Sequence, residues 1–210
     1  MKPITIIFIN ALLLCSFSMT AQETNENEDK EPEIAFNTFG FSAKGGFNFA
    51  TATKGAGENP PDARTSIYLG GAVEIPVVKN IFSAQAEVLY SRQGFERNYS
   101  YLGEEYQTLY KLDYINIPLL AKYYVLKGFS LEAGPQFSFL INDKIGNSLD
   151  DEERKNEEIN NFDMGLAAGI TFQFNSGLFI NGRYNHGFKE IFKDSEGKNM
   201  VIQFGLGYKF

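Results

Sequence analysis

The sequence predicts an all-β protein, an eight-stranded antiparallel up-and-down transmembrane β-barrel. From Phe36 to the end of the chain, apolar side chains alternate with small or polar ones, which is the period of a β-strand. The connections between the alternating segments are long and short in turn, as in a meander of antiparallel strands. The small and polar set carries few charges, which suits the narrow interior of an eight-stranded barrel better than a water-covered surface.

The residues before this pattern make up two expected segments. Lys2, an apolar run and the small residue Ala21 indicate a secretory signal peptide over 1–21. A membrane-anchor helix is the alternative, but Asn10 and several Ser and Thr residues interrupt the run. Residues 22–35 hold six acids and one lysine, so we expect a disordered acidic tail of net charge −5 on the periplasmic side.

Eight alternating segments make up the barrel domain expected over 36–210. They are 39–49, 67–75, 82–91, 115–125, 129–141, 162–174, 178–185 and 201–210. The cleanest of them runs from Phe129 to Ile141, where every odd-numbered residue is apolar. The long connections, including 93–113 and 142–160, should lie on one rim and the short turns on the other. Both ends of the barrel segment are then expected on the short-turn, periplasmic rim.

The alternation alone does not say whether the apolar set meets lipid or fills a core. A secreted lipocalin-like carrier would have it inside, whereas a membrane barrel has it outside. Ten residue steps from Ile115 to Val125, at about 3.3 Å each and tilted, give the roughly 25 Å of a lipid-facing band. We therefore expect the apolar set outside. The inward set then holds seven charges that can pair in the lumen, which are Lys44, Glu74, Glu87, Lys122, Glu132, Arg183 and Lys209.

Charge and residue usage argue against several functional classes. The net charge of −7 makes a nucleic-acid partner unexpected. A single cysteine, Cys15, allows neither an intramolecular disulfide nor a cysteine-based metal site. His186 is the one histidine, and its position in the alternation places it on the lipid-facing side near the loop rim, where an interface residue is expected rather than a catalytic one. We expect neither an enzyme nor a bound cofactor or metal.

Several stretches resemble the outer-membrane β-barrel family of Bacteroidetes-type bacteria, whose members are called PorT-like or porin-family proteins. The matching stretches are "GFSAKGGFNFA", "GGAVEIPVVKNIFSAQAEVLYSRQGF", "LDYINIPLLAKYYV", "GFSLEAGPQFSFLI" and "GLGYKF", which together span most of 36–210. The resemblance implies an eight-stranded barrel in the outer membrane of a Gram-negative cell. It implies no particular task, because the functions of most members are undefined. Phe210 resembles the C-terminal aromatic signal for membrane insertion, which implies a barrel-assembly machinery as a partner.

Two connections have a functional and a structural interpretation. Residues 142–160 hold seven acids and three bases, which could bind divalent cations and bridge to lipopolysaccharide, but no EF-hand spacing is present and a solvated loop is the simpler expectation. The tyrosine-rich stretch 98–114 could be a binding platform for a glycan or a protein. Its structural interpretation is a hairpin that projects above the membrane with tyrosines packed across the strands.

These observations lead to one expected function and two alternatives. The expected protein is a sealed monomeric scaffold in outer-membrane lipid and lipopolysaccharide, which presents extracellular loops for adhesion, recognition or envelope integrity. The first alternative is a narrow porin-like channel for ions or small solutes, but eight strands leave little room for a pore. The second alternative is the secreted carrier, which requires the two faces to be exchanged.

Overall fold

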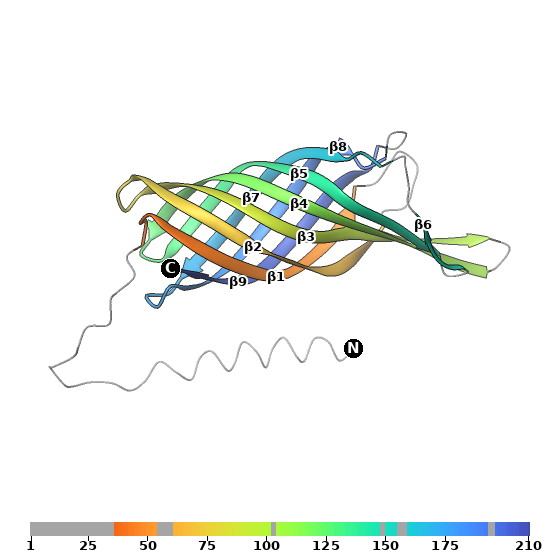
Figure 1. Ribbon diagram of the computed structural model, residues 1–210, viewed down its shortest axis with the longest axis horizontal. Coiled ribbons are helices and arrows are strands. Elements are labelled where there is room, and N and C mark those ends of the chain that lie inside the picture. The colour runs from red at the N-terminus through yellow and green to blue at the C-terminus, as the bar shows by residue number, and fades with distance from the viewer. Residues whose placement is uncertain (1–35, 54–60, 102–103, 148–149, 155–158, 193–195) are drawn as a thin grey trace, which may run out of the picture. The chain divides into compact units, whose positions relative to one another are not determined.

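The computed structural model describes residues 36–53, 61–101, 104–147, 150–154, 159–192 and 196–210. The signal peptide and the tail expected over 1–21 and 22–35 lie outside these residues. The described residues form nine strands (Figure 1), which are β1 Gly40–Ala52, β2 Asp62–Val78, β3 Phe82–Tyr101, β4 Glu104–Leu126, β5 Phe129–Asn147, β6 Asp150–Arg154, β7 Phe162–Gln173, β8 Leu178–Glu190 and β9 Lys198–Lys209. Within these parts of the chain, no helix has the length and apolarity needed to cross a membrane.

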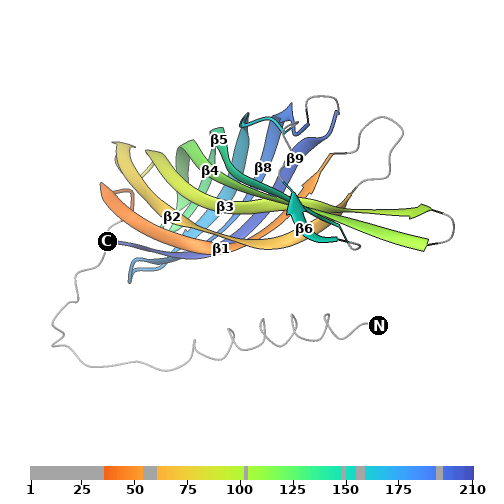
Figure 2. The ribbon, with the colours of Figure 1, turned by 45° about the vertical axis from the view of Figure 1, so that its right-hand side comes forward.

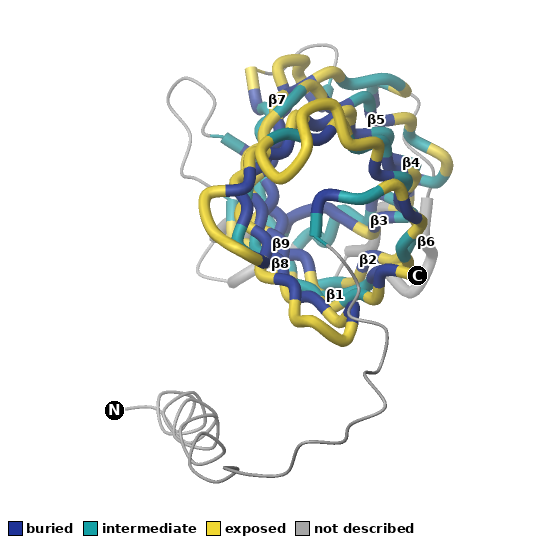
Figure 3. Tube along the Cα trace, turned by 90° about the vertical axis from the view of Figure 1, so that its left-hand side faces the viewer, coloured by how far each residue is buried: buried dark blue, intermediate teal, exposed yellow. Residues whose placement is uncertain are grey.

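Eight of these strands close into an antiparallel ring, which confirms the predicted fold class. The order around the ring is β4, β3, β2, β1, β9, β8, β7 and β5, and β4 pairs with β5 to complete it. The first and last strands pair from Ser42↔Lys209 to Ala52↔Asn199. Figure 3 shows the ring from the end at which the tight turns lie. The short strand β6 pairs with β5 alone, beyond the ring.

The tight turns of this end depend on residues with positive φ. Asn80 (φ 62°) separates β2 from β3, Gly128 (φ 79°) separates β4 from β5, and Gly177 (φ 88°) separates β7 from β8. A Cβ on Gly128 would lie 2.4 Å from the carbonyl oxygen of Gln173 and 3.2 Å from the ring of Phe36. Glycine is therefore required there both by its backbone conformation and by the close approach of its neighbours.

At the opposite end, two strands run beyond their neighbours (Figures 1 and 2). Pairing of β2 with β3 ends at Asp62↔Glu96, whereas β3 and β4 stay paired to Tyr101↔Glu104. Most of 93–113 forms a long hairpin, which agrees with the structural interpretation of 98–114 as a projecting hairpin. The expectation of a solvated loop over 142–160 needs correction, because the end of β5 and all of β6 lie in it. A hairpin outside lipid needs no apolar face, so the alternation did not show these strands.

The two faces of the ring are arranged as the sequence predicts for a membrane barrel. Phe47 is 58% exposed on the outside, whereas Lys44 is 7% exposed inside, and this contrast recurs on every strand of the ring. The outer surface is covered by Phe, Leu, Ile, Val and Tyr side chains. The carrier hypothesis required the apolar set to fill the interior, so the structure contradicts it.

A glycine at a close strand contact provides a test of this packing. Gly94 in β3 has φ 123°, and a Cβ there would lie 1.9 Å from the carbonyl oxygen of Tyr110 in β4. A side chain at this position would strain the backbone and collide with the carbonyl oxygen of Tyr110. We therefore expect Gly94→Ala to lower the free energy of unfolding by about 1–3 kcal/mol. Urea unfolding of the barrel refolded in lipid vesicles measures this loss.

The matched control is Gly71→Ala in β2. A Cβ at Gly71 would meet only the carbonyl oxygen of Ser42, at an ordinary contact distance of 3.4 Å. This variant should unfold like the original chain. Equal stability of the two alanine variants would contradict the close packing described at Gly94.

Candidate functional site

The seven charged residues that the sequence assigns to the lumen are all buried inside the ring. They come from seven different strands, because each occupies an inward position of its own strand. None is more than 7% exposed, and they are Lys44, Glu74, Glu87, Lys122, Glu132, Arg183 and Lys209. The structure divides them into two ion-paired groups.

The central group is built around the guanidinium of Arg183. Its Nη1 lies 2.7 Å from Glu87 Oε2, and its Nη2 lies 2.6 Å from Glu132 Oε1. Its Nε donates a further hydrogen bond to Glu132 Oε1 at 2.9 Å. Lys44 Nζ lies 2.7 Å from Glu87 Oε2. Two cations and two carboxylates therefore share one network that ties β1, β3, β5 and β8 together, and the planar fork of arginine fits two carboxylates at once.

The second group lies nearer the turn end, around the carboxylate of Glu74. Lys209 Nζ is 3.0 Å and Lys122 Nζ is 3.2 Å from the same oxygen, Glu74 Oε2. The hydroxyl of Tyr124 donates to the other oxygen. Below this group, the Asn37 amide donates to Ser83 Oγ at 2.8 Å. The residue that precedes β1 by three positions therefore closes this end of the lumen from inside.

A layer of amides and hydroxyls lies on the other side of the central group. Asn48 Nδ2 donates to Ser91 Oγ at 2.9 Å, and Gln203 Nε2 donates to Asn48 Oδ1 at 2.8 Å. Asn185 Nδ2 donates a third hydrogen bond, to Gln203 Oε1 at 2.9 Å. The hydrogen bonds link the neighbouring strands β8, β9 and β1 and reach from β1 past β2 to β3. Uncharged polar side chains thus fill the middle of the lumen.

An apolar cap closes the loop end, and the sequence analysis did not foresee it. The rings of Phe95 and Tyr110 stack with centroids 4.7 Å apart, and Phe192 meets both edge-on. Ile159, from the segment between β5 and β7, and Ile191, from the segment between β8 and β9, are buried against this cluster. A bridge between Ile159 and Phe192 joins the two segments. The sequence does contain an indication of this cap, because large apolar residues occupy inward positions at the loop end of β3 and β4.

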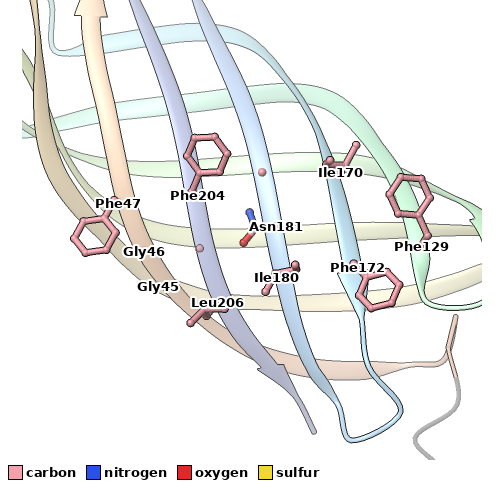
Figure 4. Close-up of a pocket in the computed structure, with 12 residues that line it drawn as sticks. Gly45, Gly46, Phe47, Phe129, Ile170, Phe172, Ile180, Asn181, Phe204 and Leu206 are labelled. Carbon is pink, nitrogen blue, oxygen red and sulfur yellow. The ribbon is translucent and has the colours of Figure 1, made fainter. Parts of the chain in front are cut away.

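The outer surface carries an apolar hollow of about 590 Å³ over β1, β9, β8 and β7 and the start of β5 (Figure 4). Outward-facing Gly45 and Gly182 provide the space. A Cβ on Gly182 would lie 3.6 Å from the ring of Phe204 and 3.9 Å from Ile170, which are ordinary contacts. The side chain of Asn181, which also borders the hollow, is buried. This hollow therefore suits a hydrocarbon chain rather than a polar substrate.

The charged side chains of the lumen are paired with one another, and the pairs leave no group placed to act on a substrate. All three lumen carboxylates accept hydrogen bonds from buried donors. His186 lies outside, with Nδ1 3.2 Å from the hydroxyl oxygen of Tyr184. In the described part of the chain, no three His, Cys, Asp or Glu side chains are grouped closely enough to hold a metal ion. The cation site considered for 142–160 falls mainly on side chains outside the described residues.

Phe210 lies on the outer surface at the turn end. Its ring centroid is 5.3 Å from that of Tyr208, and its backbone N–H donates to the carbonyl of Phe41 at 2.9 Å. The hydrogen bond continues the pairing between β9 and β1. Its action as an insertion signal stays a prediction.

Comparisons with known proteins agree with this architecture. Two solved structures share the fold: Ail, the attachment invasion locus protein of Yersinia pestis (16% identity, 82% of this chain and 99% of that chain covered, TM-score 0.51), and Neisserial surface protein A (11%, 81% and 97%, TM-score 0.55). No curated protein sequence matches the chain significantly. The more specific PorT-like assignment stays a prediction.

Residues 20–193 match the family described as "Outer membrane protein beta-barrel domain". This match covers most of the chain and agrees with a closed ring that carries its apolar side chains outside. The chain belongs to the outer membrane protein beta-barrel domain family, and its place is the outer membrane.

Proposed function

We propose that this barrel is a sealed, non-enzymatic scaffold that presents β-structure outside the cell for adhesion or recognition. The observation that carries the proposal is the projecting hairpin of β3 and β4. Beyond Glu96, β3 has no β2 partner among the described residues, and beyond Thr108↔Asn147, β4 has no β5 partner. Unpaired strand edges are a template for another chain, so a barrel that extends them from the membrane offers them to a partner.

The filled lumen supports a scaffold rather than a channel. Two ion-paired groups, an amide layer and an apolar cap succeed one another along the axis. Two small cavities that border buried polar residues measure about 10 Å³ each, which is near the smallest volume that holds one water molecule. We therefore assign the lumen charges to a structural plug that seals the barrel.

The two rims of the barrel support one orientation in the membrane. Outer-membrane barrels have short turns on the periplasmic side and longer loops outside the cell. Here the tight turns at Asn80, Gly128 and Gly177 share one end, and Phe36 and Phe210 lie near it. We propose that both termini face the periplasm and that the β3–β4 hairpin faces outward. The apolar hollow then lies against outer-membrane lipid.

The charge of the outer segments limits the chemistry of the partner. Ail, which shares the fold, is an attachment protein that was crystallised with a heparin analogue, sucrose octasulfate. In this chain, 142–160 carries seven acids against three bases, which would repel a sulfated glycan. We propose a protein or an uncharged glycan as the extracellular ligand, with divalent cations as the bridge to any anionic partner such as lipopolysaccharide. The barrel would act as a monomer after insertion by the barrel-assembly machinery.

The first prediction concerns adhesion by the projecting hairpin. Arg97 and Thr108 lie opposite each other, so 98–107 can be replaced by an Asn-Gly turn without shifting the strands. We expect this variant to keep the heat-modifiable gel mobility of a folded barrel, while adherence of expressing cells to immobilised protein and glycan surfaces falls at least about tenfold. The control is a substitution of Ser176, which lies in a turn of the opposite rim and should leave adherence unchanged. Unchanged adherence after the hairpin is shortened would contradict the proposal.

The second prediction concerns conductance through the lumen. Because the plug and the cap fill the interior, the purified barrel should show no steady current steps in a planar lipid bilayer. Steady channels whose conductance changes in Arg183→Met or Glu132→Gln would favour the narrow channel instead.

The third prediction concerns the energy of the central network. Arg183→Met leaves the carboxylates of Glu87 and Glu132 buried without their shared partner, so we expect about 3–5 kcal/mol less stability in urea unfolding. Combining it with Glu132→Gln should restore part of the loss, because one unpaired charge is removed. Arg92→Met is the matched control, because this exposed arginine lies 3.7 Å from Asp113 in a surface pair worth at most about 1 kcal/mol. A loss in Arg183→Met no larger than in Arg92→Met would show that the network does not stabilise the barrel.

A further inference from the structure

The charges buried in the lumen do not balance. The two groups contain four cations, Lys44, Lys122, Arg183 and Lys209, but only three carboxylates, Glu74, Glu87 and Glu132. The other buried carboxylate among the described residues, Asp143, lies near the loop end of β5, opposite Leu112. A buried charge without a counter-charge is costly, so the excess of one positive charge requires compensation.

The excess is confined to the group near the turn end. In the central group, Arg183 and Lys44 are matched by Glu87 and Glu132. Around Glu74, two lysines share a single carboxylate oxygen, at 3.0 Å and 3.2 Å. Any compensating negative charge therefore belongs beside Lys122 and Lys209.

A small cavity lies at this place. It measures about 10 Å³, and its lining includes Lys122, Lys209, Glu74 and Gln173. Gln173 is 3% exposed, and its Nε2 has no hydrogen-bond partner among the described residues. Lys44 and Glu132 also border the cavity, so three ammonium groups face two carboxylates there and leave an excess of one positive charge. This excess and the unused N–H donor of Gln173 both favour an anion. Its size admits a single water molecule or monatomic ion and excludes polyatomic anions such as phosphate.

We propose that this cavity binds one monatomic anion, chloride under physiological conditions, between Lys122, Lys209 and Gln173. The bound anion neutralises the excess charge around Glu74 and accepts the hydrogen bond that Gln173 Nε2 otherwise leaves unmade. The site makes chloride a structural component of the folded barrel. A water molecule in the cavity, or the loss of a proton by one lysine, is the competing outcome.

The test is the thermal unfolding midpoint of the refolded barrel in chloride and in gluconate at equal ionic strength. A ligand that binds only the folded state raises the midpoint as its concentration rises. Above the dissociation constant, we expect an increase of about 3–5 °C for each tenfold rise in chloride, with bromide acting similarly and gluconate having no effect. A midpoint independent of the halide would overturn the proposal.

Two variants make the result specific. Lys209→Met leaves one lysine for Glu74 and removes the excess charge, so its midpoint should not respond to chloride. Lys79→Met removes an exposed lysine of the turn between β2 and β3 and should respond as the original chain does. An equal chloride response in both variants would show a general salt effect and refute the site.

Diffraction from crystals of the unaltered barrel grown in bromide gives a measurement that does not depend on a folded variant. An anomalous peak among Lys122, Lys209 and Gln173 is expected. Its absence at saturating bromide would overturn the proposal even if Lys209→Met fails to fold.

Discussion

The closed ladder of backbone hydrogen bonds is the constraint on which the rest of the structure depends. In lipid, a backbone N–H or C=O without a partner costs several kcal/mol, so a sheet that crosses the membrane must pair its first strand with its last. Pairing of β1 with β9 and of β4 with β5 meets this requirement. Once the ring is closed, each side chain faces either lipid or the lumen, and the alternation of the sequence follows directly.

Closure also determines what the interior must contain. A ring of eight strands encloses a space just wide enough for side chains, so its contents must pack and pair with one another. Arg183 satisfies two carboxylates from different strands, and Asn48 and Gln203 link their strands through amides. The contacts of Arg183 join strands that are not neighbours in the ring, whereas Asn48 and Gln203 lie on the paired strands β1 and β9. The interior therefore acts as the core of the protein, although it is polar.

The sequence predicted the ring and the facing of its residues, but only part of the two regions beyond the lipid band. Phe47 and Lys44 could be assigned to opposite faces because lipid imposes a period of two on every strand that crosses it. The cap of Phe95, Ile159 and Phe192 could not be predicted from the sequence, because its residues come from separate segments and no periodicity indicates that they meet. The β3–β4 hairpin was one of two interpretations of 98–114, and the alternation could not decide between them because, outside lipid, backbone pairing tolerates polar residues on both faces.

The difference between the lipid band and the regions beyond it explains why the function of the barrel is harder to infer from the sequence than its fold. Residues between the rims are constrained by contact with lipid and by packing in the lumen. Barrels of this kind share both constraints, whatever their function. Only the segments beyond the ring are free of both constraints, and there β3 and β4 extend past their neighbours while β6 pairs with β5. An edge binds through its main chain, which gives affinity without a sequence motif. Recognition by such an edge leaves little trace in the sequence, so it is found from the register of the strands.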